Sequence, residues 1–469
     1  MSIDMLPDDV LLEIFDFFVR GEYDLEAWQR VVHVCRRWRR IVFGSPRRLD
    51  LRLVCSDKTP ARDTLDIWPA LPLSIECEGA ESVDNILAVL EHSDRVFNIF
   101  ANLGRSDLEQ ISAAMQVPFP ELTHLVLQSN GEIGEIGETV SALPDSFLGG
   151  SAPRLERLAL DDIPFPGLPK LLLSATHLHA LHLNNIPHSG YISPESIVTA
   201  LSTLTRLDTL WLEFESPQSR PDPEHQHPPP PTRSVLPNLE YFQFKGDSEY
   251  LEVVVAHIDA PQLFDLRTTL FNDIVFDTPQ LTQFISRTLR VEALEKAHVI
   301  FEDDAATVEL SSLTVLTRGK RGNLRVMIPC SELDWQVSSM EQVYTSCLPP
   351  LPTSDLHIIG DSYILQHWQG NVENALWLRL LHPFTSVKNL YLSGRVARRI
   401  VPALQDLVGD RATEVLPTLQ NIFLEGRRSR EIPSHINKPP ARQRIHSCIM
   451  CEKAFNRPSA LKKVHPPSS

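Results

Sequence analysis

The sequence predicts a mixed α/β fold in which a short N-terminal helical module precedes an irregular solenoid of strands and helices. Two patterns predict it. Apolar residues recur with a helical period as far as Val42, and a Leu-x-x-Leu-x-Leu triplet then returns along most of the chain. At 469 residues the chain is too long for one small core. We expect the helical module at residues 1–46, the solenoid at 47–430 and a tail at 431–469.

The first predicted helix follows Pro7. Proline suits the start of a helix because no donor is needed there, and the acidic pair Asp8 and Asp9 favours the positive end of the helix dipole. The helix presents one apolar stripe with i, i+3, i+4, i+7 spacing, formed by Leu11, Ile14, Phe15 and Phe18.

A second apolar stripe follows with the same period. Its members are Val31, Val34, Cys35, Trp38, Ile41 and Val42. Helices this short are unstable alone and must pack together, and so small a unit buries little core. We therefore expect the module to cover its remaining apolar surface against another protein.

The stretch LPDDVLLEIF from Leu6 and the segment Val34-Cys35-Arg36-Arg37-Trp38 resemble an F-box in sequence, order and spacing. The resemblance implies a three-helix module that docks on the Skp adaptor of a cullin-RING ubiquitin ligase. The alternative is a self-contained core. The expected adaptor contacts are Leu6, Pro7, Leu11, Ile14, Phe15, Val34, Cys35, Trp38 and Ile41, with the last four divided between core and interface.

Composition excludes several classes of protein. A net charge of −16 argues against general nucleic-acid binding, which needs a basic surface. We find no signal-peptide pattern and no apolar run of membrane-spanning length, so we expect a protein of the cytoplasm and/or nucleus. The cysteines before Cys448 are scattered and show no disulfide framework.

The solenoid is expected to begin with a strand at Leu49–Leu53, where apolar and polar residues alternate. A helix is expected at Ser193–Leu201, between two repeats. The triplets that define the repeat are Leu122, Leu125, Leu127; Leu155, Leu158, Leu160; Leu178, Leu181, Leu183; Leu207, Leu210, Leu212; and, more loosely, Val96, Ile99, Ala101; Leu239, Phe242, Phe244; Leu263, Leu266; Val387, Leu390, Leu392; and Leu419, Ile422, Leu424.

The triplets resemble leucine-rich repeats, in which each copy adds one short strand to a growing core. Combined with the module, they are similar to F-box proteins of the fungal type. Residues that alternate with the inward leucines must face the opposite side of the sheet. Large aromatics there are typical of a binding face, although a neighbouring loop could equally cover them. The expected target contacts are Val126, His182, Trp211, Lys245, Tyr391 and Phe423.

Two regions interrupt the repeat. Residues 217–234 are rich in proline and are expected to form an extended loop, with a proline-rich ligand for a partner domain as the alternative. Residues 293–347 contain strands such as Ala297–Phe301 and Asn323–Ile328, but no clear repeat register.

No catalytic motif fits. The run of Gly131, Gly134 and Gly137 lacks the spacing of a dinucleotide site, and Gly360-Asp361-Ser362 lacks a downstream acid and histidine of the esterase kind. We therefore expect a protein that is not an enzyme.

The tail resembles the first part of a zinc finger of the two-Cys, two-His type. Cys448 and Cys451 form a Cys-x-x-Cys pair, with Phe455, Leu461 and His465 at nearly the family's spacing. A zinc site needs four ligands, and His465 lies one place late with no histidine after it. One interpretation is an incomplete finger that borrows a ligand such as His446. We favour the other, a disordered tail without bound metal or other cofactor.

Together these patterns predict the substrate-recognition subunit of a Skp-cullin-F-box ubiquitin ligase. The module would bind the Skp adaptor and thereby the cullin, and the repeats would bind a protein target. Two alternatives are an adaptor-binding scaffold outside any ligase, and an acidic repeat protein whose terminal motif binds metal or DNA.

Overall fold

The computed structural model describes residues 5–21, 27–56, 61–78, 83–130, 141–217, 233–271, 278–288, 294–312, 322–348, 352–360, 372–405 and 415–425. The chain divides into two compact units, Met1–Thr209 and Leu210–Ser469. Four sequence features lie wholly or mainly outside the described residues: the glycine run, the Pro-rich segment, the pair Asp361 and Ser362, and the tail with Cys448, Cys451 and His465.

The N-terminal module contains three helices, α1 (Asp8–Gly21), α2 (Ala27–Val32) and α3 (Arg36–Gly44). The second apolar stripe is therefore not one helix, because the chain leaves the helical conformation between Val32 and Arg36. Cys35 is the N-cap of α3, and its Sγ accepts a hydrogen bond from the Trp38 N–H at 3.5 Å. The break satisfies a donor at the start of α3 and turns Val34 toward solvent.

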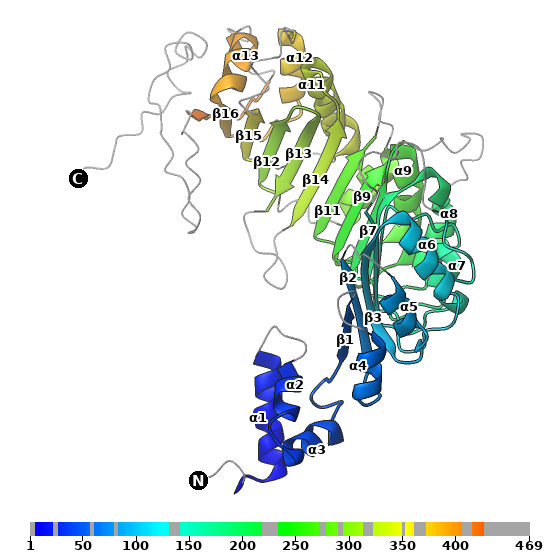
Figure 1. Cartoon of the computed structure of the whole chain (residues 1–469). Helices are drawn as coiled ribbons and strands as arrows, with labels where there is room; N and C mark the ends of the chain where they lie inside the picture. The colour runs from blue at the N-terminus through cyan, green and yellow to red at the C-terminus, as the bar shows by residue number, and fades with distance from the viewer. Residues whose placement is uncertain are drawn as a thin grey trace. The chain divides into compact units, whose positions relative to one another are not determined.

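Six strands of the first unit form a parallel sheet in chain order. They are β1 (Leu53–Ser56), β2 (Leu73–Glu78), β3 (Val96–Leu103), β4 (His124–Ser129), β5 (Arg157–Asp161) and β6 (Ala180–Ile186). Helices connect them along one face of the sheet (Figure 1): α4 (Ala61–Ile67), α5 (Asp84–Leu90), α6 (Arg105–Ala114), α7 (Leu168–Leu172) and α8 (Pro194–Leu201), with short 3-10 helices at Phe147–Gly150 and His188–Gly190.

The expected strand at Leu49–Leu53 is wrong, and the expected helix at Ser193–Leu201 is confirmed. Residues 46–50 form a turn, with Asp50 at a φ of 50°, and β1 begins only at Leu53. The N–H groups of Leu49 and Leu51 bond back to Ser45 and Pro46, so both leucines are buried without joining the sheet. The helix α8 begins where the Ser193 hydroxyl accepts from the Ser196 N–H.

The second unit contains a longer sheet in the strand order β7-β9-β11-β14-β13-β12-β15-β16-β17. These strands are β7 (Thr209–Phe214), which starts at the last residue of the first unit, β9 (Tyr241–Gly246), β11 (Asp265–Leu270), β12 (Lys296–Phe301), β13 (Ala305–Ser311), β14 (Asn323–Pro329), β15 (Asp355–Gly360), β16 (Asn389–Ser393) and β17 (Asn421–Glu425). The helices are α9 (Ser248–His257), α10 (Pro279–Thr288), α11 (Leu333–Gln342), α12 (Asn374–Leu381) and α13 (Gly394–Gln405), with a π turn at Val343–Cys347; β8 (Ser234–Val235) and β10 (Ile258–Asp259) form a separate pair.

An antiparallel meander explains why the repeat register disappears after residue 293. The chain enters β12, reverses into β13 and reverses again into β14, which pairs with β11. Strand β15 then returns to pair with β12 in parallel. Strand β13 is therefore inserted between two strands that keep the common direction, and the predicted strands at Ala297–Phe301 and Asn323–Ile328 are confirmed.

The leucine triplets form the core beneath the strands of both units. All members from Leu122 to Leu266, and the triplet from Val387 to Leu392, are at most 4% exposed. The last triplet differs, because Leu419, Ile422 and Leu424 are only half-buried.

None of the helices in the described part of the chain has the length and apolar character needed to cross a bilayer.

Replacing an inward residue of β4 should cost far more stability than replacing its neighbour. Leu127 is fully buried and Val126, on the opposite face, is half-exposed. We expect Leu127→Ala to lower the free energy of unfolding by about 3 kcal/mol through the lost burial and the cavity. The matched Val126→Ala change should cost about 1 kcal/mol or less. Urea unfolding followed by circular dichroism measures both, and equal losses would contradict the assigned faces.

Candidate functional site

Exposed apolar side chains are concentrated in the N-terminal module. Ten large hydrophobic residues are exposed in the described part of the chain, and five of them lie between Met5 and Val34. These five are Met5 (79% exposed), Val10 (39%), Ile14 (42%), Phe17 (83%) and Val34 (59%). So much apolar surface on a small unit is typical of a protein contact.

Helix α1 carries two apolar stripes that face opposite surroundings. Leu11 and Phe15 are at most 1% exposed, and the Phe15 ring lies 4.8 Å from the Trp38 ring. Val10, Ile14 and Phe17 share an i, i+4, i+7 spacing on a face open to solvent. The module therefore needs only one stripe for its own core.

The expected adaptor contacts divide accordingly. Pro7, Ile14, Val34 and Cys35 are exposed, and Leu6 and Trp38 are partly exposed. Leu11, Phe15 and Ile41 are buried and pack within the module. Adaptor binding by the exposed residues remains a prediction.

Arg37 of α3 holds the start of α1 in place. Its guanidinium donates to the Leu6 carbonyl at 2.6 Å and to the Asp8 carboxylate at 2.6 and 3.0 Å. Arg48 forms a further ion pair with Glu13 on the same helix. These contacts fix the orientation of α1, and hence of its exposed stripe, with polar bonds.

Trp28 joins the module to the first strand of the sheet. Its indole is fully buried between Phe43 and Trp68, with ring centroids 6.0 and 5.1 Å away. The indole Nε1–H donates to the Arg52 carbonyl at 3.0 Å, one residue before β1. A single aromatic residue thus contacts α3, the segment after α4 and the entry to the sheet.

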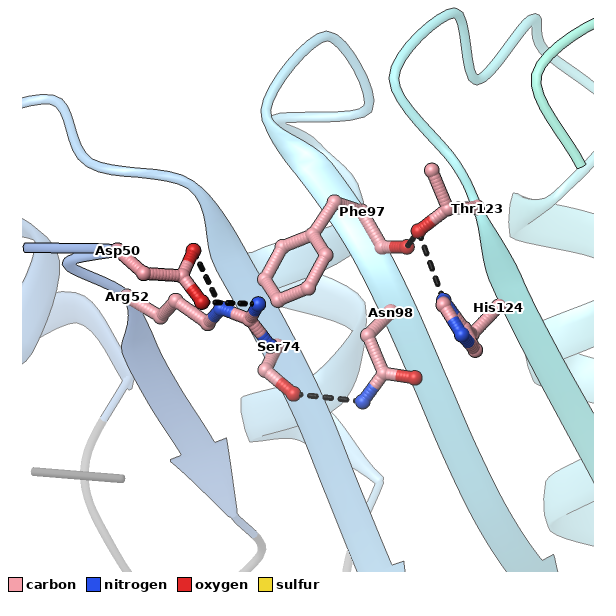
Figure 2. Close-up of polar contacts among 7 residues, drawn as sticks. All are labelled: Asp50, Arg52, Ser74, Phe97, Asn98, Thr123 and His124. Atoms are coloured by element: carbon pink, nitrogen blue, oxygen red, sulfur yellow. Dashed lines mark hydrogen bonds and ion pairs between the residues drawn. The ribbon is translucent and has the colours of Figure 1, made fainter. Parts of the chain in front are cut away.

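Figure 2 shows the polar contacts that continue from this point across β1 to β4. Asp50 accepts from the Arg52 Nε at 3.2 Å, and the guanidinium lies 4.5 Å from the centroid of the Phe97 ring. Next along the sheet, Asn98 donates to the Ser74 hydroxyl at 2.7 Å. Thr123 donates to the Phe97 carbonyl and lies 2.9 Å from His124 Nδ1.

The open face of the first unit carries two neighbouring rows of side chains, because its strands pair in parallel register. Asn98, His124 and Arg157 are direct partners on β3, β4 and β5 and form a row of hydrogen-bond donors. Two residues further along each strand, Phe100, Val126 and Ala159 form an apolar row. His182 of β6 is the register partner of Ala159.

Both histidines on this face are biased toward the neutral form. Partial burial lowers the pKa of His182 to about 4, helped by the positive charge of Arg157 and opposed by Asp208. The pKa of His124 is also lowered, first by burial and then by Arg157 and Arg52, against the opposite effect of Glu156. Arg157 is therefore the principal fixed positive charge between them.

The open face of the second unit carries a ladder of stacked rings. His298, His357, Tyr391 and Phe423 are register partners on β12, β15, β16 and β17. Successive ring centroids are 4.7, 4.1 and 4.6 Å apart, and the Tyr391 plane lies within 4° of His357 and 12° of Phe423. A second ladder runs beside it, in which Asn421 donates to Asn389 and Asn389 to Asp355.

The structure places the expected target contacts on these open faces with unequal exposure. Val126, Trp211, Lys245 and Phe423 are half-exposed. His182 and Tyr391 are only 9% and 7% exposed, and target binding by these six residues remains a prediction. Tyr391 is covered by the rings on either side, and the Lys245 ammonium lies 5.6 Å from the Phe271 ring.

The buried thiols of the second unit do not resemble reactive groups. Burial raises the pKa of Cys330 and of Cys347 to about 11, and Cys347 accepts a hydrogen bond from the Thr278 hydroxyl. Within the described ranges, no three His, Cys, Asp or Glu side chains gather as a metal site. The candidate zinc ligands of the tail lie outside those ranges.

Comparison with known proteins identifies the N-terminal module. Residues 3–55 match the model of the F-box-like family. No curated protein matches the chain. Among solved structures, the leucine-rich repeat-containing protein LegL7 from Legionella pneumophila is similar at 12% identity over 80% of this chain and 90% of that chain, with a TM-score of 0.25. The chain thus carries an F-box-like domain, which is followed by a sheet of mainly parallel strands with connecting helices.

Sequence reasoning missed several residues of these sites. Val10 and Phe17 were detectable, because seven apolar residues between Val10 and Phe18 are too many for one buried stripe. Trp28, Arg157 and His298 carried no local signal, since their importance comes from partners on other strands or helices.

Trp28→Phe should destabilise the first unit without removing its aromatic packing. The change leaves the Arg52 carbonyl without the indole donor, which should cost about 1 to 2 kcal/mol. Trp335→Phe is the control, because Trp335 is 53% exposed. Urea unfolding compares the two variants with the original chain. An equal stability for all three would show that the bond contributes nothing.

His182 should make stability depend on pH. At pH 7 its imidazole is neutral in both folded and unfolded chains. Below its ordinary pKa of 6.5 the unfolded chain takes up a proton that the folded chain, with a pKa of about 4, does not. Stability should therefore fall as the pH drops from 6.5 toward 4. His182→Gln should flatten this dependence in urea midpoints measured at pH 7 and pH 5, and an unchanged slope would contradict the assignment.

Proposed function

We propose that the chain is the substrate-recognition subunit of a Skp-cullin-F-box ubiquitin ligase. One observation carries the proposal: the segment that matches the F-box-like family also carries half of the exposed large hydrophobic residues of the described chain. A domain that exposes Val10, Ile14 and Phe17 while burying Leu11 and Phe15 has an apolar face ready for a partner.

In this proposal the chain binds and does not catalyse. The exposed stripe of α1, with Pro7 and Val34, contacts the Skp adaptor and so reaches the cullin. The open sheet faces bind a protein target and hold it near the ubiquitin-conjugating enzyme, in the cytoplasm and/or nucleus. The parallel register supports the second role, because it aligns side chains from many strands into continuous rows.

Charging the exposed stripe should abolish adaptor binding and leave the fold intact. Ile14 and Phe17 are exposed, so Ile14→Asp with Phe17→Asp removes contacts without opening the core. We expect at least a tenfold loss of adaptor in co-purification, which corresponds to about 1.4 kcal/mol or more. A charge at Leu11 would be a poor test, since that residue is fully buried.

Val117→Asp is the matched control, because Val117 is 46% exposed in the same unit but outside the F-box-like segment. It should retain both the adaptor and the cullin. If the original chain captures neither protein, or the double variant captures both normally, the proposal is wrong. Adaptor without cullin would favour a scaffold outside the ligase.

A further inference from the structure

Arg157 has no carboxylate partner in the part of the chain that the structure describes. It is exposed on the open face of β5. Two other arginines near the open faces carry their own acid: Arg52 bonds to Asp50, and Arg267 bonds to Asp265 at 2.8 Å. Arg157 therefore offers a free guanidinium on an open face that also carries the carboxylates Glu76 of β2 and Asp161 of β5.

Two imidazoles lie on the strands on either side of Arg157. His124 is its register partner on β4, and His182 lies on β6, where its own partner is Ala159. The charge of Arg157 lowers the pKa of both rings, while Glu156 opposes it at His124 and Asp208 opposes it at His182. Three groups that can carry positive charge thus come from three successive strands.

The apolar row lies directly beside this cluster. Phe100 and Val126 are half-exposed, and Ala159 projects only a methyl group between Val126 and His182. The two rows are two residues apart on each strand, which is about 6.6 Å. A segment that ran across the strands between the rows in an extended conformation would direct successive side chains to opposite sides.

We propose that the open face of β3 to β6 binds an extended segment of a target protein in which acidic and apolar residues alternate, with one carboxylate held by Arg157 between His124 and His182. The apolar residues of the segment lie on Phe100 and Val126. This inference rests on the proposed function only in calling the bound protein a ligase target.

The guanidinium of Arg157 selects a carboxylate at its own position along the segment. A carboxylate forms a charge-assisted and bidentate pair with a guanidinium, and a basic segment would meet Arg157 with like charge. The bound carboxylate also favours the protonated form of both histidines. The other charged groups that face them are Glu156, Arg157 and Arg52 for His124, and Arg157 and Asp208 for His182. With a pKa of about 4, His182 stays neutral between pH 7.5 and 6. Proton uptake over this range is therefore expected at His124, and binding should strengthen as the pH falls while glutamate stays ionised.

The test measures binding of the full chain to a fluorescein-labelled peptide of alternating glutamate and leucine. We expect Arg157→Gln to weaken binding about tenfold. Arg398→Gln, at an exposed arginine on α13 of the other unit, is the control and should leave binding unchanged.

Replacing leucine by serine in the peptide should also weaken binding, because the apolar row loses its contacts. His124→Gln should reduce proton uptake, measured by calorimetry in buffers of different ionisation enthalpy.

Three results would overturn the inference. They are equal binding of a peptide with glutamine in place of glutamate, equal losses for Arg157→Gln and Arg398→Gln, and binding only when phosphoserine replaces glutamate. Circular dichroism confirms that each variant is folded. The assay contains no Skp adaptor, so its failure is distinct from failure of adaptor capture, which would affect only the proposed ligase role.

Discussion

The structure depends on the alternation of side chains along parallel strands that pair in register. In β4 to β6 the inward leucines Leu125, Leu158 and Leu181 are direct partners and each is fully buried. The same register necessarily aligns the residues between them on the opposite face. The hydrophobic core therefore fixes the surface: once the leucines are stacked, His124 must lie beside Arg157 and Val126 beside Ala159.

The second unit shows what this constraint does when the chain reverses direction. Strand β13 runs antiparallel, yet its residues still meet their neighbours in pairs, with Glu309 opposite both His298 and Arg325. The rows of aligned side chains therefore continue across β13, whereas the leucine triplet pattern is interrupted there. Beyond it, the ring ladder from His298 to Phe423 brings planar groups about one strand spacing apart. The rings of His357, Tyr391 and Phe423 stack face to face, and the His298 ring is tilted by 38° against His357.

The sequence was sufficient for the elements whose signal is local. Triplets such as Leu178, Leu181 and Leu183 predicted buried strands, and Ser193 marked the start of α8 correctly. The wrong predictions occurred where one sequence pattern fits two different local structures. Leu49 and Leu51 alternate like a strand but lie in a turn, because backbone bonds to Ser45 and Pro46 compete successfully with the sheet. Both leucines are as buried as the inward residues of a strand, so the alternating pattern alone does not distinguish this turn from a strand.

The sites were less predictable than the fold, because their character depends on what other elements leave uncovered. The sequence left open whether Tyr391 is a target contact or is covered, and the structure shows that stacked rings cover most of it. Arg157 gave no signal, since an unpaired arginine is recognised only when its neighbours are known.

The exposed stripe of α1 is compatible with a stable module because polar contacts fix the helix from its other side. Packing alone would favour burying Val10, Ile14 and Phe17 against α2 and α3, but these two short helices already contact the stripe of Leu11 and Phe15. Arg37 binds the first turn of α1, and so prevents a rotation of the helix that would turn its exposed stripe inward. The apolar face is thus kept available by directional bonds, whereas hydrophobic packing, which is not directional, would have hidden it.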